Sequence, residues 1–326
     1  MTTPPKINQQ VQALLSKQGK PGLLKAKATI KNSQISPSIK EILTYFIDET
    51  WPNTHHPALI SLCCQAVNGN PKSTYDISAS IVLLTGAADI HDDIIDKSTT
   101  KSQKQTAFGK YNKELVLLAG DALLFKGMLM LHNACAKFSA KKQKAIFDCV
   151  KKSFFNIGYA ISSERCLRGK PFEVASYRKV VESKGGVTEA CATIGAIIGN
   201  AKANQLDALR HYGQTLGVLM TLKNEFTDLN DPKELDNRRK NEILPLPLLY
   251  ALKDASANRQ LTTLLQGKMT KKKAAKIAEI AKETEKVQAL IEEMRNMVLD
   301  EEGYLEPIKF NVGSLKLLLE SSTADL

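Results

Sequence analysis

The feature that most constrains this chain is an apolar segment, residues 77–88, that runs directly into the acidic stretch of residues 89–96. The apolar segment has no proline and a helical composition. If the helix continues, Asp92 and Asp96 lie one turn apart, flanked by Asp89 and Asp93. Like charges at this spacing destabilise a helix by roughly 0.2–0.5 kcal/mol per pair. A hard dication such as Mg²⁺ is the natural remedy, although a solvated acidic helix end is the simpler alternative.

The composition favours helices throughout. The chain has 326 residues, enough for one large domain or two ordinary ones, and only 18 glycines and 12 prolines. Helix-forming residues such as alanine, leucine and lysine dominate, and neither a run of strands nor a solenoid repeat is recognisable. We therefore expect an all-α fold, a single-domain bundle of long antiparallel helices around a central cavity.

Breaks in the pattern separate the expected helices. Residues 1–36 are polar and lysine-rich, so we expect a flexible N-terminal arm there and one helical domain over residues 37–326. We expect loops at residues 97–109 and around Pro232, Pro245 and Pro247. Apolar periodicity predicts helices at residues 39–47, 58–67, 75–96, 113–136, 141–162, from about 176 onward, 206–228 and 270–297.

The charge balance indicates an anionic partner without identifying it. The net charge is +11 and the pI is about 9.2, which suits a phosphorylated substrate, a nucleic acid or an anionic membrane surface. The lysine cluster at residues 268–276 is interpreted as a solvated helix face, so we expect no nucleic-acid partner. No run of about 18 apolar residues is present, so we expect no membrane span.

The six cysteines indicate a reducing compartment. None forms a Cys-x-x-Cys pair, and most lie in apolar surroundings, as small core residues do. The N-terminus has no apolar signal core. We therefore expect a cytoplasmic protein.

A second polar cluster follows the first by roughly 130 residues. Asn224 and Asp228 are again four residues apart at the end of an apolar helix. Two such helix ends facing each other across a bundle would hold Mg²⁺ between them, and a diphosphate bridged by the metal fits this arrangement. If the diphosphate is allylic, metal ions and cations would stabilise it as a leaving group when its C–O bond ionises. An apolar cavity would then shield the resulting carbocation from water.

With both clusters in view, the chain resembles the trans-isoprenyl diphosphate synthases, the polyprenyl synthetase family, from about residue 55 to 250. The segment Asp92–Asp96 resembles the first Asp-rich motif, and residues 120–124 (Gly-Asp-Ala-Leu-Leu) match a characteristic family segment. Lys184-Gly-Gly resembles the Lys-Thr-Gly that contacts the allylic diphosphate. Residues 212–228 occupy the place of the second Asp-rich motif, and residues 244–246 (Leu-Pro-Leu) resemble the segment after it.

The resemblance implies a set of site residues. The expected metal ligands are Asp92, Asp93, Asp96, Asn224 and Asp228, with Mg²⁺ as cofactor. Asp92, Asp96 and Lys184 are the expected catalytic residues. The expected substrate-binding residues are His56, Lys101, Lys184, Lys223, Ala87 and Ala88. The family is usually dimeric, so a homodimer is expected.

The chain departs from the family in three segments. The second motif reads Asn-Glu-x-x-Asp, which loses one charge at Asn224 while Glu225 keeps its own. The segment that usually binds isopentenyl diphosphate has no Lys or Arg, although His56 is a possible substitute donor and a structural histidine is the alternative. The Arg-Arg-Gly segment is replaced by Lys101-Ser-Gln, which keeps one charge.

Three functions remain open from the sequence. The first is Mg²⁺-dependent condensation of an allylic diphosphate with isopentenyl diphosphate. The resemblance implies that the residues one turn before the first Asp form the cavity floor, so small Ala87 and Ala88 predict a product of geranylgeranyl length or longer. The second is a divergent prenyltransferase or terpene-cyclase-like enzyme that uses another acceptor. The third is a non-catalytic subunit of a heteromeric synthase.

Overall fold

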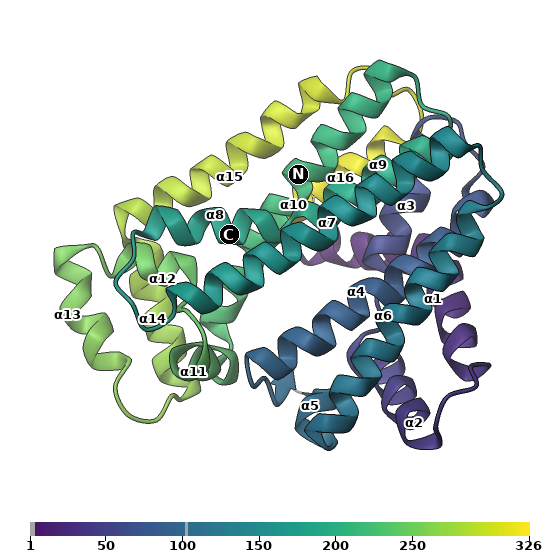
Figure 1. The fold of residues 1–326 in the computed structure, drawn as a ribbon. Coiled ribbons are helices and arrows are strands. Elements are labelled where there is room, and N and C mark those ends of the chain that lie inside the picture. Colours follow the sequence, from purple (N-terminus) through teal and green to yellow (C-terminus); the bar gives the residue numbers. More distant parts are fainter. Residues whose placement is uncertain (1–3, 102–103) are drawn as a thin grey trace.

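The computed structural model describes residues 4–101 and 104–326, with side chains from residue 6, and they form a bundle of long helices (Figure 1). The first half contains α1 (Pro4–Lys31), α2 (Pro37–Tyr45), the short π-helix η1 (Phe46–Thr50), α3 (His55–Ala66), the 3-10 turn η2 (Pro71–Thr74), α4 (Tyr75–Ile95), the strands β1 (Thr100–Lys101) and β2 (Lys104–Gln105), α5 (Ala107–Lys110) and α6 (Lys113–Cys135). The second half contains α7 (Ala140–Leu167), α8 (Val174–Lys184), α9 (Gly186–Ile198), α10 (Ala203–Asn230), α11 (Pro232–Asn241), α12 (Leu246–Ala251), α13 (Ala255–Leu264), α14 (Lys271–Glu283), α15 (Glu285–Tyr304) and α16 (Val312–Thr323). The expected all-α class is confirmed.

Helix α4 is at the centre of the first half and packs closely on α6. Two glycines of α6 make this possible, because a Cβ at Gly120 would lie 2.6 Å from His91 Nε2 and one at Gly127 would lie 2.9 Å from Leu84. The antiparallel pairing brings the Gly-Asp-Ala-Leu-Leu segment beside the acidic end of α4. His91 lies 3.2 Å from Asp121 of that segment, so it faces α6 and supports this contact.

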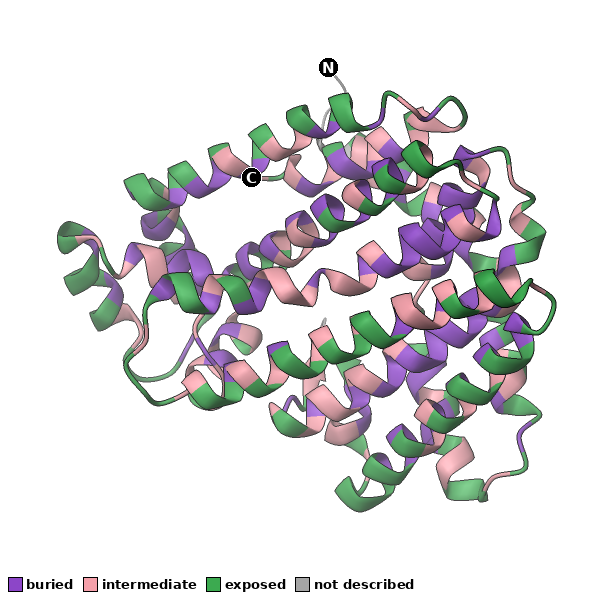
Figure 2. Ribbon diagram, turned by 45° about the horizontal axis from the view of Figure 1, so that its top comes forward, coloured by how far each residue is buried: buried purple, intermediate pink, exposed green. Residues whose placement is uncertain are grey.

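The apolar core forms two regions on either side of α4. One lies among α3, α9, α10, α14 and α15, and the other lies among α1, α2, α4 and α6. Buried residues follow the inward faces of the long helices, while exposed residues cover the outward faces (Figure 2). Such one-sided burial is what the helical periodicity of the sequence predicts.

The expected flexible arm is wrong for residues 4–31. They form α1, which packs on α3 and α4 and buries Val11, Leu15, Leu23 and Ile30. Gly19 does not break the helix. A Cβ there would lie 2.0 Å from the Thr54 carbonyl oxygen, so the glycine lets α1 touch the start of α3.

Three smaller expectations also change. The helix expected at residues 270–297 is two helices, because Thr284 is extended (φ −77°, ψ 143°) and its hydroxyl donates to Ala281 O at 2.8 Å. The expected loop around Pro232 contains α11, which is capped by the Asp231 carboxylate, and α12 carries Pro247 in its first turn. The loop at residues 97–109 contains the β1–β2 hairpin and α5.

Helix α6 has an unusual outer face. Within the described residues it is the one helix that length and composition alone would allow to cross a membrane, although its other face packs on α4. Leu118, Phe125 and Leu129 lie on the outer face at helical spacing and are 46–67% exposed. No membrane is needed to explain the inner face, which is part of the bundle core.

Candidate active site

The acidic end of α4 begins the site. Asp96 caps the helix, and its backbone N–H donates to Asp92 O at 2.8 Å. Burial raises the pKa of the Asp92 carboxyl, and burial together with Asp92 and Glu164 raises the pKa of Asp96 to about 7. In the part of the chain that the structure describes, no ion pair joins either carboxylate to a cation. Lys184 and Lys101 lower the pKa of Asp92 without contacting it, so Asp92 and Asp96 are a pair of oxygen donors with no direct cation partner among the described residues.

The other two aspartates of this stretch lie on a separate stripe. Lys101 in β1 places its ammonium 2.7 Å from Asp89 Oδ1 and 3.2 Å from Asp93 Oδ1. Asp93 is only 4% exposed, and burial raises its pKa to about 7 despite this lysine. The structure thus pairs Asp93, an expected metal ligand, with Lys101, an expected diphosphate ligand. Neighbouring Ser102 and Gln103 lie outside the described residues.

Lys184 reaches the same site from the end of α8. Gly185 follows it, and a Cβ at Gly185 would lie 2.6 Å from the Gly217 carbonyl carbon, so only a glycine pair lets this junction cross α10 so closely. The Lys184 ammonium lies 2.6 Å from Glu164 Oε2 on α7. Burial favours the neutral amine, but Glu164 and Asp92 together raise the pKa of Lys184. Lys184 therefore stays charged beside Asp92.

Glu164 is a site residue that the sequence did not reveal. It is 7% exposed and lies on the last turns of α7, beyond residue 162, where the sequence pattern ended this helix. Burial would raise its pKa, but Lys184 and Arg238 hold it below the ordinary value. A buried, ionised carboxylate therefore lies opposite α4.

The second cluster is built differently from its expected form. Glu225 is buried and Asp228 is partly buried, and the Arg238 guanidinium of α11 lies 3.0 Å from Glu225 Oε1 and 2.6 Å from Asp228 Oδ2. Asn224, an expected metal ligand, is exposed. The sequence missed Arg238 because its segment was expected to be a loop.

The two clusters face each other. Arg238 of the second cluster lowers the pKa of Asp96 in the first, and Lys184 lowers the pKa of Asp228. Burial has the larger effect on Asp228 and raises its pKa overall. Asn237 of α11 donates to the Asp96 carbonyl at 3.5 Å and to Ser98 Oγ at 3.3 Å. The structure therefore brings Asp92, Asp96, Lys184 and Asp228 to one site.

Two expected substrate ligands lie elsewhere or are uncharged. The prediction for Lys223 is wrong, because its ammonium binds Ser321 O at 2.6 Å and Asp325 at 3.3 Å near the C-terminus. His56 is half-buried, and burial followed by the neighbouring His55 lowers its pKa to about 3. The Asn53 amide oxygen accepts from the His56 backbone, so its nitrogen donates to His56 Nδ1 at 2.6 Å and fixes a neutral ring.

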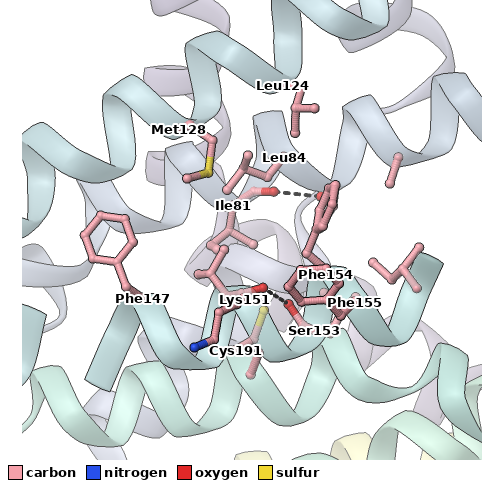
Figure 3. Close-up of a pocket in the computed structure, with 16 residues that line it drawn as sticks. Ile81, Leu84, Leu124, Met128, Phe147, Lys151, Ser153, Phe154, Phe155 and Cys191 are labelled. Atoms are coloured by element: carbon pink, nitrogen blue, oxygen red, sulfur yellow. Dashed lines mark hydrogen bonds between the residues drawn. The ribbon is translucent and has the colours of Figure 1, made fainter. Parts of the chain in front are cut away.

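An apolar cavity of about 330 Å³ lies among α4, α6, α7 and α9 (Figure 3). Ala88, one turn before Asp92, lines it, and so do Thr85, Leu84 and Ile81. The hydroxyl groups of Thr85 and Ser153 donate to carbonyls of their own helices, and the Lys151 ammonium pairs with Asp148 at 3.3 Å, so most of the wall is apolar. Ala87, expected at the floor, is instead fully buried in the core region shared with α1 and α2.

Asp92 and Asp96 suit Mg²⁺ in donor type, since both offer carboxylate oxygens that no ion pair uses among the described residues. Among the described side chains, no group of three His, Cys, Asp or Glu residues already converges on one point. A metal here would thus need further ligands, which substrate phosphates provide in many magnesium sites. The second cluster suits a dication less well, because Arg238 already binds both of its carboxylates.

The fold is that of the isoprenoid synthases. Geranylgeranyl pyrophosphate synthetase from Pyrococcus horikoshii matches with a TM-score of 0.82 at 19% identity, covering 97% of this chain and 98% of that one. Heptaprenyl diphosphate synthase from Staphylococcus aureus matches with a TM-score of 0.78 at 16% identity, covering 95% and 98%.

The sequence gives the family. The polyprenyl synthetase model matches residues 37–284, and the chain belongs to this family. Geranylgeranyl diphosphate synthase of Methanosarcina mazei is 27% identical over 184 residues, 55% of each chain. A (2E,6E)-farnesyl diphosphate synthase of Mycobacterium bovis is 23% identical over 225 residues, 64% of this chain and 59% of the relative. The chain thus spans less than two thirds of the length of these curated relatives.

Proposed function

We propose that this chain is a Mg²⁺-dependent prenyltransferase that ionises an allylic diphosphate and condenses it with isopentenyl diphosphate. The product would be a trans-prenyl diphosphate of geranylgeranyl length or longer. The observation that carries the proposal is the position of Ala88. It lines the apolar cavity one turn before Asp92, so a diphosphate at the acidic helix end would direct its hydrocarbon chain into the cavity.

Each part of the site has a role in this reaction. Asp92 and Asp96 would hold Mg²⁺, which stabilises the charge of the departing diphosphate. Lys184 adds a fixed positive charge on the opposite side, oriented by Glu164. The apolar walls exclude water from the allylic cation. Cys191 in the wall is no competing nucleophile, because burial raises its pKa and keeps it a thiol.

The depth of the cavity supports a long product. From Ala88 to Ile81, both of which line the cavity, α4 extends about 10 Å along its axis. The lining side chains of α4 near the acidic end are small, and the first bulky ones are Leu84 and Ile81. A chain of several isoprene units would therefore meet its first obstruction well below the diphosphate.

A second candidate is favoured by the acceptor side of the site. Lys101 is already bound by Asp89 and Asp93, and His56 is neutral, so this region offers little charge for a second diphosphate. An enzyme of the same class that transfers the allylic group to an uncharged acceptor would tolerate this. We rank it second because the family match extends through this region.

We also propose that the chain is a homodimer that functions in a reducing compartment such as the cytoplasm. Leu118, Phe125 and Leu129 of α6 form an exposed apolar face, and Phe155 and Tyr159 extend exposed apolar surface along α7. A second copy of the chain would remove these side chains from water.

The test is incubation of the purified protein with Mg²⁺, farnesyl or geranylgeranyl diphosphate, and labelled isopentenyl diphosphate. Label in a longer prenyl diphosphate supports the proposal. Release of pyrophosphate without incorporated label supports the second candidate. Turnover of neither kind, restored only by a partner chain, would mean that this chain is a non-catalytic subunit and would contradict the proposal.

A further inference from the structure

Arg238 is the most completely bonded side chain near the site. It is 4% exposed, and each of its three nitrogens donates. Nε donates to Ile243 O at 2.9 Å, and Nη1 donates to Glu225 Oε1 at 3.0 Å and to Asp228 Oδ2 at 2.6 Å. Nη2 donates to Tyr177 OH at 2.5 Å and to both oxygens of Glu225 at 3.1 and 3.2 Å. An arginine has five N–H donors in a fixed plane. These contacts use all five, so no N–H of the guanidinium is left for a substrate.

Glu225 is held as firmly as the arginine that it binds. Its Oε2 accepts from the backbone N–H of Leu246 at 2.7 Å, and its Oε1 accepts from Tyr177 OH at 3.4 Å. The residue is 4% exposed, so its negative charge is balanced entirely by the protein. Glu225 therefore anchors α11 and α12 to α10 and is not available as a metal ligand.

Asp228 is the remaining acidic residue of the second motif, and Arg238 also controls it. Asp228 Oδ2 accepts the 2.6 Å hydrogen bond from Arg238 Nη1, and the charge of Lys184 also lowers the pKa of this carboxyl. A divalent ion at this oxygen would therefore have to displace the Arg238 N–H that already binds it. Asn224, the other expected ligand of this motif, is exposed and uncharged.

The first motif has the opposite balance. Asp92 and Asp96 have carboxyl groups without a paired cation among the residues described here, while Lys101 is used by Asp89 and Asp93. The carboxylates without a cation partner in this motif therefore lie on the α4 side of the site. On the α10 side the Arg238 guanidinium already binds both Glu225 and Asp228.

We propose that Arg238 is the built-in cation of the second acidic motif, so that this chain binds divalent metal at Asp92 and Asp96 but not at Asp228. The inference rests on the proposed function, since it assigns the metal that would hold the diphosphate to α4 alone, with the Lys184 ammonium opposite. Arg238 itself is a positioning residue, because its donors are all used within the protein.

The test counts bound Mn²⁺ by electron paramagnetic resonance of the free ion, in the presence of inorganic pyrophosphate. Asp228→Asn preserves the size of the side chain, and we expect it to bind as many ions per chain as the wild type. Asn224→Asp is expected to bind the same number, because Arg238 still occupies the cluster. Asp92→Asn is expected to lose at least one ion per chain.

A double variant, Asn224→Asp with Arg238→Met, should open the second motif and gain at least one ion. Its matched control is Asn224→Asp with Arg239→Met, since Arg239 binds Asp236 and Leu265 O instead. A thermal melt verifies that each variant is folded. If the double variant does not fold, the Asp228→Asn count still decides the matter.

Loss of a bound ion in Asp228→Asn would overturn this inference and leave the proposed function intact. Absence of Mn²⁺ binding by the wild type would overturn both. Failure of prenyl transfer with the expected ion counts would overturn the proposed function alone.

Discussion

Ala87 and Ala88 are neighbours on α4 but face different environments. Ala88 lines the apolar cavity, whereas Ala87 is 1% exposed and packs in the core region formed with α1, α2 and α6. Successive residues of a helix point about 100° apart, so one face of α4 serves the cavity and the other serves the fold. The pair separates effects on the product from effects on stability.

Ala88→Phe should shorten the product. The ring would fill the cavity one turn below the acidic helix end and block chain growth by at least one isoprene unit. Product chromatography after incubation with labelled isopentenyl diphosphate measures this directly. Ala87→Phe is the matched control, expected to leave product length unchanged and to lower stability by about 1–3 kcal/mol through overpacking. An unchanged product from Ala88→Phe would refute the assignment of the cavity.

Phe147→Leu should lengthen the product. Phe147 lines the cavity and lies about 25 Å along α7 from Glu164, at the end far from the acidic residues. Figure 3 shows its ring on the opposite side of the cavity from Phe154 and Phe155. A smaller side chain there should admit a longer tail at a cost on the order of 1 kcal/mol in stability. The same chromatography reports the shift, and a shorter product would contradict the prediction.

His56 should make the protein less stable in mild acid. Burial lowers its pKa from 6.5 to about 3, so between these values the unfolded chain binds a proton that the folded chain does not. Stability from this group is complete above pH 6.5 and falls as the pH decreases. Between pH 7.5 and 5 the free energy of unfolding should fall by on the order of 1 kcal/mol less in His56→Gln than in the wild type. Chemical denaturation at both pH values measures it, with His132→Gln, an exposed histidine of α6, as control. Equal acid losses in wild type and His56→Gln would contradict a neutral His56 ring.

Phe125→Glu should dissociate the proposed dimer. Phe125 is 67% exposed at the centre of the apolar face of α6, where a carboxylate would be buried against a second copy. Light scattering after gel filtration should show a dimer for the wild type and a monomer for the variant. Leu24→Glu replaces an equally conspicuous apolar residue, 52% exposed on α1, and should remain dimeric. A monomeric wild type at micromolar concentration would rule out this interface.

Much of the site could be predicted from local patterns. The spacing of Asp92 and Asp96 places them on one stripe of α4. Asp89 and Asp93 have the same spacing and lie on a second stripe, which faces Lys101. The apolar run before them indicates a helix that is buried, and the structure bears this out. Lys184 was predictable from its resemblance to the family segment, although its contact with Glu164 was not.

The missed features depend on contacts between distant segments. The segment of α1 is polar and lysine-rich, which indicates a flexible arm, but its Gly19 and Gly22 allow close contact with α3 and α4. Arg238 is one of several charged residues in a polar segment, and only the approach of α8 and α10 selects it. No periodicity in the sequence distinguishes Arg238 from Arg239.

The most direct test of the account is calorimetric titration of the protein with inorganic pyrophosphate, with and without Mg²⁺. The account predicts binding that requires Mg²⁺ and that weakens at least roughly tenfold in Asp92→Asn, with Asp148→Asn, a partly exposed aspartate of α7, unchanged. Binding that is equally strong without Mg²⁺, or undiminished in Asp92→Asn, would contradict it.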